Sequence, residues 1–190
     1  MNHKLILSGL LATCLLLEGC AAAVVAGAAG TAVVANDRRT VGAQLDDESI
    51  ELKISGLIAG DPTLRKQTHI TAVSMDGEVL LVGQAPGEQL RSQILNGVRT
   101  IPGVRKIHNQ IRLMTPTRMG TRTHDTWLTS VIKGKLLAAG DLDSSAVKVV
   151  TENSEVFLMG LVNRQEAELA TEIARNVSGV TKVVKVFQYQ

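Results

Sequence analysis

The stretch that decides the fold is DGEVLLVG at residues 76–83, because NSEVFLMG at residues 153–160 repeats its pattern. A second pair repeats at nearly the same interval, with IPGVRKI at residues 101–107 and VSGVTKV at residues 177–183. Self-similarity at a constant interval indicates a duplicated structural unit. The predicted divisions are a first domain over residues 46–114, a linker over residues 115–123 and a second domain over residues 124–190.

Each copy has the same predicted order of elements. Apolar residues at helical spacing, such as Ile50 and Ile54, predict a first helix. The Asp-Gly pair at residues 76–77 is a favoured hairpin turn, so a strand is expected on either side of it. A second helix over residues 88–99 ends before the Pro-Gly pair at residues 102–103, and an alternating strand follows. The predicted fold class is therefore α+β, with two tandem αββαβ domains, each a three-stranded mixed sheet with two helices on one face.

The N-terminus has the pattern of a lipoprotein signal peptide. The apolar run over residues 5–17 is about as long as a signal-peptide core and shorter than the roughly 20 residues that span a bilayer. The pair Gly19-Cys20 resembles a lipobox, which predicts cleavage after residue 19 and a lipid on Cys20. Glu18 departs from that pattern, so an uncleaved anchor, lengthened by the apolar residues 21–35, is the alternative.

A lipid on Cys20 would leave the mature protein without a free thiol, because Cys14 lies in the predicted signal peptide at residues 1–19. Acyl chains such as palmitate anchor a protein with about 0.8 kcal/mol per buried methylene. We expect no cofactor other than this covalent lipid. Enterobacterial lipoproteins with Asp at the second mature position are usually retained in the inner membrane, so by resemblance Ala21 favours export to the outer membrane, where the protein would face the periplasm. Residues 20–45 have no helical or strand periodicity and are interpreted as the lipidated N-terminus and tether.

The repeated segments resemble the BON family, bacterial periplasmic domains of αββαβ order. One hallmark of that family is a glycine that ends the second strand, which Gly83 and Gly160 match. Another is a glycine before the last strand, which Gly103 and Gly179 match. With the signal peptide, the resemblance covers essentially the whole chain and extends to outer-membrane lipoproteins with two BON domains. It implies phospholipid binding and a role in the integrity of the cell envelope.

No catalytic pattern occurs in the sequence. It contains no metalloprotease His-Glu pair, no serine nucleophile elbow and no glycine-rich phosphate loop. His124 beside Asp125 could form an acid-base pair, but Asp125, or alternatively Thr123, is better interpreted as a helix N-cap. The acidic run at residues 46–48 is likewise interpreted as the first turn of a helix rather than as a metal site. We expect no enzymatic activity and no metal, and a formal net charge of +2 argues against nucleic acid as a partner.

Comparison of the two copies locates a candidate binding surface on the first helix of the second domain. Matched apolar positions are expected in the core, whereas Trp127 corresponds to Ser49 and Val131 corresponds to Lys53. Helical spacing places these excess hydrophobic residues on one stripe, away from the core face and bordered by two lysines. The predicted phospholipid-binding residues are Trp127, Ser130, Val131, Lys133, Gly134, Lys135, Leu137 and Ala138.

This stripe has the composition of a membrane contact. Indole rings prefer the headgroup boundary, and the ammonium groups of Lys133 and Lys135 could reach lipid phosphates. The sequence thus predicts a non-enzymatic lipoprotein that binds anionic phospholipids at a membrane surface. Two alternatives are open. Trp127 could pack against the linker or the other domain, or the stripe could belong to a periplasmic adapter that docks onto an envelope assembly or cell-wall complex.

Overall fold

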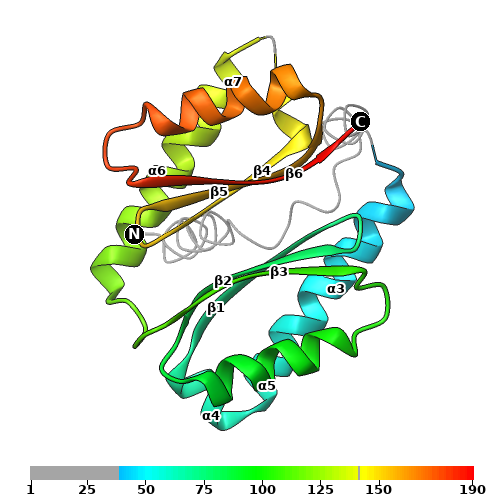
Figure 1. The fold of residues 1–190 in the computed structure, drawn as a ribbon, viewed down its shortest axis with the longest axis vertical. Helices are drawn as coiled ribbons and strands as arrows, with labels where there is room; N and C mark the ends of the chain where they lie inside the picture. The colour runs from blue at the N-terminus through cyan, green and yellow to red at the C-terminus, as the bar shows by residue number, and fades with distance from the viewer. Residues whose placement is uncertain (1–38, 141) are drawn as a thin grey trace, which may run out of the picture. The chain divides into compact units, whose positions relative to one another are not determined.

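The αββαβ order occurs twice in this computed structural model, which describes residues 39–140 and 142–190 (Figure 1). The predicted signal peptide, Cys20 and most of the predicted tether lie outside the described residues. Among the described helices, none combines the length and hydropathy needed to cross a bilayer. Both copies belong to one unit, residues 36–190.

The elements of the two copies correspond in order. The first copy contains α3 (Val41–Gly60), α4 (Pro62–Gln67), β1 (His69–Met75), β2 (Glu78–Ala85), α5 (Glu88–Arg99) and β3 (Lys106–Leu113). The second contains α6 (Met119–Ala138), η1 (Ser144–Ala146), β4 (Val147–Glu152), β5 (Glu155–Val162), α7 (Arg164–Arg175) and β6 (Lys182–Tyr189). In each sheet the central strand pairs antiparallel with the strand before it and parallel with the strand after it. The prediction of an α+β fold with two mixed three-stranded sheets is confirmed.

The apolar side chains of each central strand belong to two hydrophobic clusters, one on either face of its sheet, because successive side chains of a strand point to opposite faces. In β2, Val79 and Leu81 pack in the core under α3 and α5, whereas Leu80 points to the face without helices. In β5, Leu158 likewise packs in the core of the second domain, and Phe157 points to the face without helices. The helix-free faces of both sheets contribute to one cluster, which contains Met75, Leu80, Val82, Phe157, Met159 and Val186. The two domains therefore pack sheet against sheet.

Both first helices begin earlier than the sequence predicts. Helix α3 begins at Val41, inside the segment interpreted as tether, because Thr40 caps it: its hydroxyl oxygen accepts a 3.1 Å hydrogen bond from the Ala43 amide. Helix α6 begins at Met119, so residues 119–123 of the predicted linker are helical. No side chain caps this second helix, which explains why its start carries no local sequence signal.

Asp125 is not an N-cap, because α6 has already begun at Met119. Its buried carboxylate accepts 2.8 Å hydrogen bonds from the backbone amides of Asn153 and Ser154, the turn residues between β4 and β5. Both turn residues have positive φ, 51° and 63°, as a type I′ hairpin requires. The carboxylate therefore fixes α6 to the hairpin of its own domain.

Asp47 has the same role in the first copy, so its interpretation as part of a helix N-terminal turn is also wrong. Its carboxylate accepts hydrogen bonds from the amides of Asp76 and Gly77 at 2.7 and 2.9 Å. The Ser74 hydroxyl donates a third, at 2.7 Å. Burial opposes ionisation of Asp47, but these hydrogen bonds, together with the Arg39 guanidinium, hold the pKa of Asp47 below its ordinary value.

Candidate functional site

The predicted binding residues lie on the side of α6 opposite its core. With 3.6 residues per turn, Trp127, Gly134 and Ala138 share one direction, and the buried Leu128 and Ile132 point the other way. Trp127 keeps 53% of its surface exposed and Leu137 keeps 73%. The exposed members of the predicted set are Trp127, Ser130, Lys133, Gly134, Lys135, Leu137 and Ala138. The structure thus brings these seven residues together on one solvent-facing surface, which we call the α6 stripe.

Val131 is placed differently from the rest of the predicted set. It is half-buried and packs against the hydrophobic core of the second domain. Its direction lies between the α6 stripe and the core face, so the side chain is drawn inward where the sheet offers apolar contacts. Val131 therefore mainly packs against the core of the second domain and adds little to the exposed surface of the α6 stripe.

Met119 belongs to the same surface, and sequence reasoning missed it. Its side chain is 73% exposed, and it lies five full helical turns before Leu137, in the same direction. The helix was expected to start later, which hid this residue. The alignment of the two copies gave no signal for it, because it sets Met119 opposite the apolar Val41 and matched apolar positions were expected in the core, whereas both residues are exposed. With Met119 included, exposed apolar side chains occur from the first turn of α6 to its last, over about 30 Å, with polar residues such as Thr123 and Ser130 between them.

The Trp127 indole stacks on the His124 imidazole, with 5.6 Å between ring centroids and 25° between planes. Trp127 belongs to none of the hydrophobic clusters formed by the described residues. The domain interface is built instead from the helix-free sheet faces. The structure therefore places Trp127 outside the contact between domains, and an aromatic pair is presented to solvent.

Polar contacts hold the first domain beside the second. The Lys148 ammonium on β4 donates to the Glu51 carboxylate at 3.0 Å and to the Ser74 carbonyl at 2.8 Å. The buried Gln84 amide on β2 donates to the Glu152 carboxylate at 2.6 Å. These bonds join residues from both copies, so the edge of the first sheet at β1 lies near β4 and the flank of α6.

His69 at the start of β1 lies among charged groups from the other domain. Its imidazole is 3.6 Å from the Glu152 carboxylate. Burial of the ring lowers the pKa of His69 below its ordinary value; Glu152 and Asp125 raise it, and Arg122 lowers it further. Because burial outweighs the carboxylates, the neutral imidazole is favoured in the folded protein.

Within residues 39–140 and 142–190, no group of three or more His, Cys, Asp or Glu side chains is arranged to hold a metal ion. His124, which the sequence sets beside Asp125, does not share a hydrogen bond with it. The ring of His124 stacks on Trp127, whereas the Asp125 carboxylate binds the hairpin amides. The two side chains thus have separate structural roles.

Comparisons with known proteins agree with this duplicated architecture. The family model described as BON domain matches residues 46–115 and 124–190. The chain is 38% identical over 180 residues to the outer membrane lipoprotein DolP of Haemophilus influenzae, covering 95% of this chain and 93% of that protein. It is 40% identical over 153 residues to the 21 kDa hemolysin of Actinobacillus pleuropneumoniae, covering 80% and 79%. Osmotically-inducible protein Y of Escherichia coli is 28% identical over 146 residues, covering 75% and 72%.

Proposed function

The chain belongs to the BON domain family, and from this membership we propose that it is a non-enzymatic protein that binds anionic phospholipid through α6 and supports outer-membrane integrity. It is an outer-membrane lipoprotein, as its likeness to DolP over nearly the whole length of both chains indicates. Cys20 is the proposed site of the lipid. The α6 stripe is the proposed second, reversible membrane contact.

The observation that carries the proposal is the exposed Trp127 on the α6 stripe, which also presents the exposed Leu137 and two lysines. Transferring the exposed half of an indole from water gives about 2 to 3 kcal/mol. Lys133 and Lys135 each add about 1 kcal/mol near an anionic surface. The sum is a weak contact on its own. Attachment through Cys20 would make it effective, because it keeps the local concentration of α6 at the membrane high.

Vesicle binding tests this function. The protein without its signal peptide and lipid is mixed with vesicles of phosphatidylcholine alone or of phosphatidylcholine with phosphatidylglycerol, and sedimentation measures the bound fraction. We expect binding to the anionic vesicles, with a loss of at least tenfold in affinity for Trp127→Glu. Leu52→Glu on α3 is the matched control, because Leu52 is 73% exposed but lies on the first domain. Equal binding by Trp127→Glu and the parent, or no binding by either, contradicts the proposal.

A protein-interaction adapter is the second candidate, and a surface on α3 favours it. Val41, Leu45 and Leu52 share one face of this helix and are 57%, 62% and 73% exposed. Glu48 points the same way, so this face suits an anionic membrane less well than α6 does. An adapter that uses α3 would lose a co-purifying envelope protein with Leu45→Lys and keep it with Trp127→Glu. Retention of the partner by both variants would remove the case for α3.

A further inference from the structure

The first domain has an open hollow at a position that a ring fills in the second domain. In the second copy the His124 imidazole lies over Gly179, and its Nε2 atom is 3.2 Å from the position that a Cβ on this glycine would take. Gly103 is the equivalent glycine of the first copy. Its chain neighbours aside, only Ile50 among the described residues lies within 4 Å of the same position. The first copy therefore lacks the ring that covers this glycine in the second.

The alignment of the two copies explains the difference. Asp46 stands where the second copy has His124, and Ser49 stands where it has Trp127. Both smaller side chains line a hollow of about 420 Å³, which we call the α3 hollow. Its wall also includes Pro102, Gly103 and Arg105. The smaller residues therefore leave a space with the volume of a ligand site.

The residues that line the α3 hollow suit an aromatic side chain. The Arg105 guanidinium is held in place, because it donates hydrogen bonds to the carboxylate and the carbonyl of Asp76. A guanidinium attracts the face of an aromatic ring, and Pro102 and Gly103 add apolar surface beside it. The exposed Asp46 carboxylate can accept a hydrogen bond from an indole N–H. The hollow thus offers the groups that bind a tryptophan side chain.

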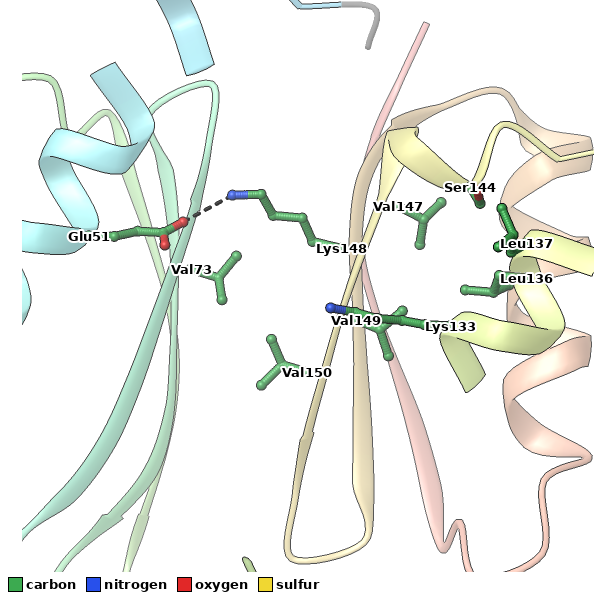
Figure 2. A pocket seen from close by; sticks show the side chains of 10 residues that line it. All are labelled: Glu51, Val73, Lys133, Leu136, Leu137, Ser144, Val147, Lys148, Val149 and Val150. Carbon is green, nitrogen blue, oxygen red and sulfur yellow. Dashed lines mark hydrogen bonds and ion pairs between the residues drawn. The ribbon is translucent and has the colours of Figure 1, made fainter. Parts of the chain in front are cut away.

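The first helices of the two domains carry opposite charge. Helix α3 has four acidic residues and one lysine, so its formal charge is −3. Helix α6 has three basic residues and one aspartate, which gives +2. The Asp46 and Glu48 carboxylates of α3 are exposed, whereas Glu51 is engaged by Lys148 of the second domain, as Figure 2 shows. Opposite charge favours contact of α3 in one molecule with α6 in another and disfavours pairing of like helices.

We propose that the α3 hollow receives Trp127 of a second copy of this chain, so that α3 of one molecule packs against α6 of another. Trp127 is 53% exposed and is the only tryptophan in the sequence. The contact joins two different surfaces, so further copies can add to either end in a ring or an open row. Attachment to one membrane would promote it by raising the local concentration. The inference goes beyond the proposed function, because no lipid takes part in the contact.

Sedimentation velocity and fluorescence of the protein without its signal peptide and lipid test this association. We expect the sedimentation coefficient to rise with protein concentration, and the Trp127 emission to shift to the blue as the indole leaves water. Ser49→Phe fills the α3 hollow and keeps Trp127 the only tryptophan, so it should abolish both changes. Glu48→Lys should weaken association severalfold, whereas Glu168→Lys, at an exposed position on α7, should not. A coefficient that stays constant up to about 1 mM protein overturns the proposal.

Mixing of two variants tests which surfaces meet. Trp127→Glu keeps the hollow and Ser49→Phe keeps the tryptophan, so each should be monomeric alone and the mixture should form a one-to-one complex. Association of Ser49→Phe by itself, as strong as that of the parent, would mean that α6 surfaces pair with each other and would overturn the proposal. Circular dichroism checks that both variants fold. If Ser49→Phe does not fold, Asp46→His takes its place, because it supplies the imidazole of the second copy, and it should weaken association at least tenfold.

Vesicle binding separates this inference from the proposed function. Ser49→Phe should bind vesicles that contain phosphatidylglycerol as tightly as the parent, because it leaves α6 unchanged. The same vesicles should reverse the association of the parent, since Trp127 cannot occupy a membrane surface and the α3 hollow at once. Vesicle binding by a protein that stays monomeric ends this proposal and leaves the membrane contact standing. Vesicle binding that leaves the association intact also contradicts it, because Trp127 would then not be the shared group.

Discussion

Replacement of Asp125 tests the link between α6 and the hairpin of the second domain. The carboxylate accepts two 2.8 Å hydrogen bonds from backbone amides and is only 4% exposed. Hydrogen bonds to a charged group contribute about 1.5 to 3 kcal/mol each. Asp125→Asn keeps the shape, but its amide nitrogen faces one of the two backbone donors, so one bond is lost and the other is neutral. We expect the free energy of unfolding to fall by about 3 kcal/mol.

The loss can be measured by thermal and urea unfolding followed by circular dichroism. For a chain of this size, 3 kcal/mol corresponds to a fall in Tm of about 6 to 12 °C. Asp47→Asn should have a similar effect, because Asp47 binds the equivalent hairpin in the first copy. Asp46→Asn is the matched control, since Asp46 is exposed on the same helix. A change below about 0.5 kcal/mol for Asp125→Asn would refute the view that the carboxylate holds the hairpin.

Three further outcomes are expected. Gly83→Ala should prevent folding of the first domain, because a Cβ there would lie 1.9 Å from the His69 carbonyl oxygen at a φ of +124°. Gly56→Ala, with open space around it, should instead raise the free energy of unfolding by about 0.5 to 1 kcal/mol. Circular dichroism of both variants, with urea unfolding of Gly56→Ala, checks this. Because the pKa of His69 is lowered in the folded protein, its contribution to stability is complete above pH 6.5 and is lost as the pH falls through the folded-state pKa. We therefore expect the urea midpoint to change less between pH 7.5 and 5 in His69→Gln than in the parent protein. Glu152, Asp125 and Arg122 face this ring and set the size of the effect. Phe157→Ala should lower the free energy of unfolding by about 3 kcal/mol and increase binding of a hydrophobic dye, and an unchanged dye signal would argue against the sheet-to-sheet contact.

The repeated strands made the fold predictable from sequence, because alternation and turn residues are local signals. The segments around residues 79–82 and 156–159 each had to form a strand, and the Asp-Gly turn placed its partner. The start of α6 was not predictable, since Arg118 provides no side-chain cap. Asp125 was misinterpreted because aspartate favours both N-caps and hairpin amides, and only the three-dimensional position distinguishes them.

The candidate site could be predicted only in part, for a similar reason. The excess hydrophobic residue Trp127 was detectable, because a helix period converts directly into a surface direction. The polar contacts between the domains were not, because residues such as His69 and Glu152 come from different copies and no periodicity relates them. Val131 also shows that an apolar residue facing a polar one in the other copy is not necessarily exposed.

The packing of the domains gives a physical reason for the duplication. Each three-stranded sheet has helices on one face only, and its other face is apolar, as Leu80 and Phe157 illustrate. A single copy would expose that face to water, at about 25 cal/mol for each Å² of apolar surface. Two copies cover each other's exposed face, and the outer faces of α3 and α6 stay free to diverge. The alignment of Ser49 with Trp127 shows this divergence. Both copies have a buried aspartate, Asp47 or Asp125, that binds the hairpin amides, whereas the exposed surface that we assign to lipid binding is confined to the second copy.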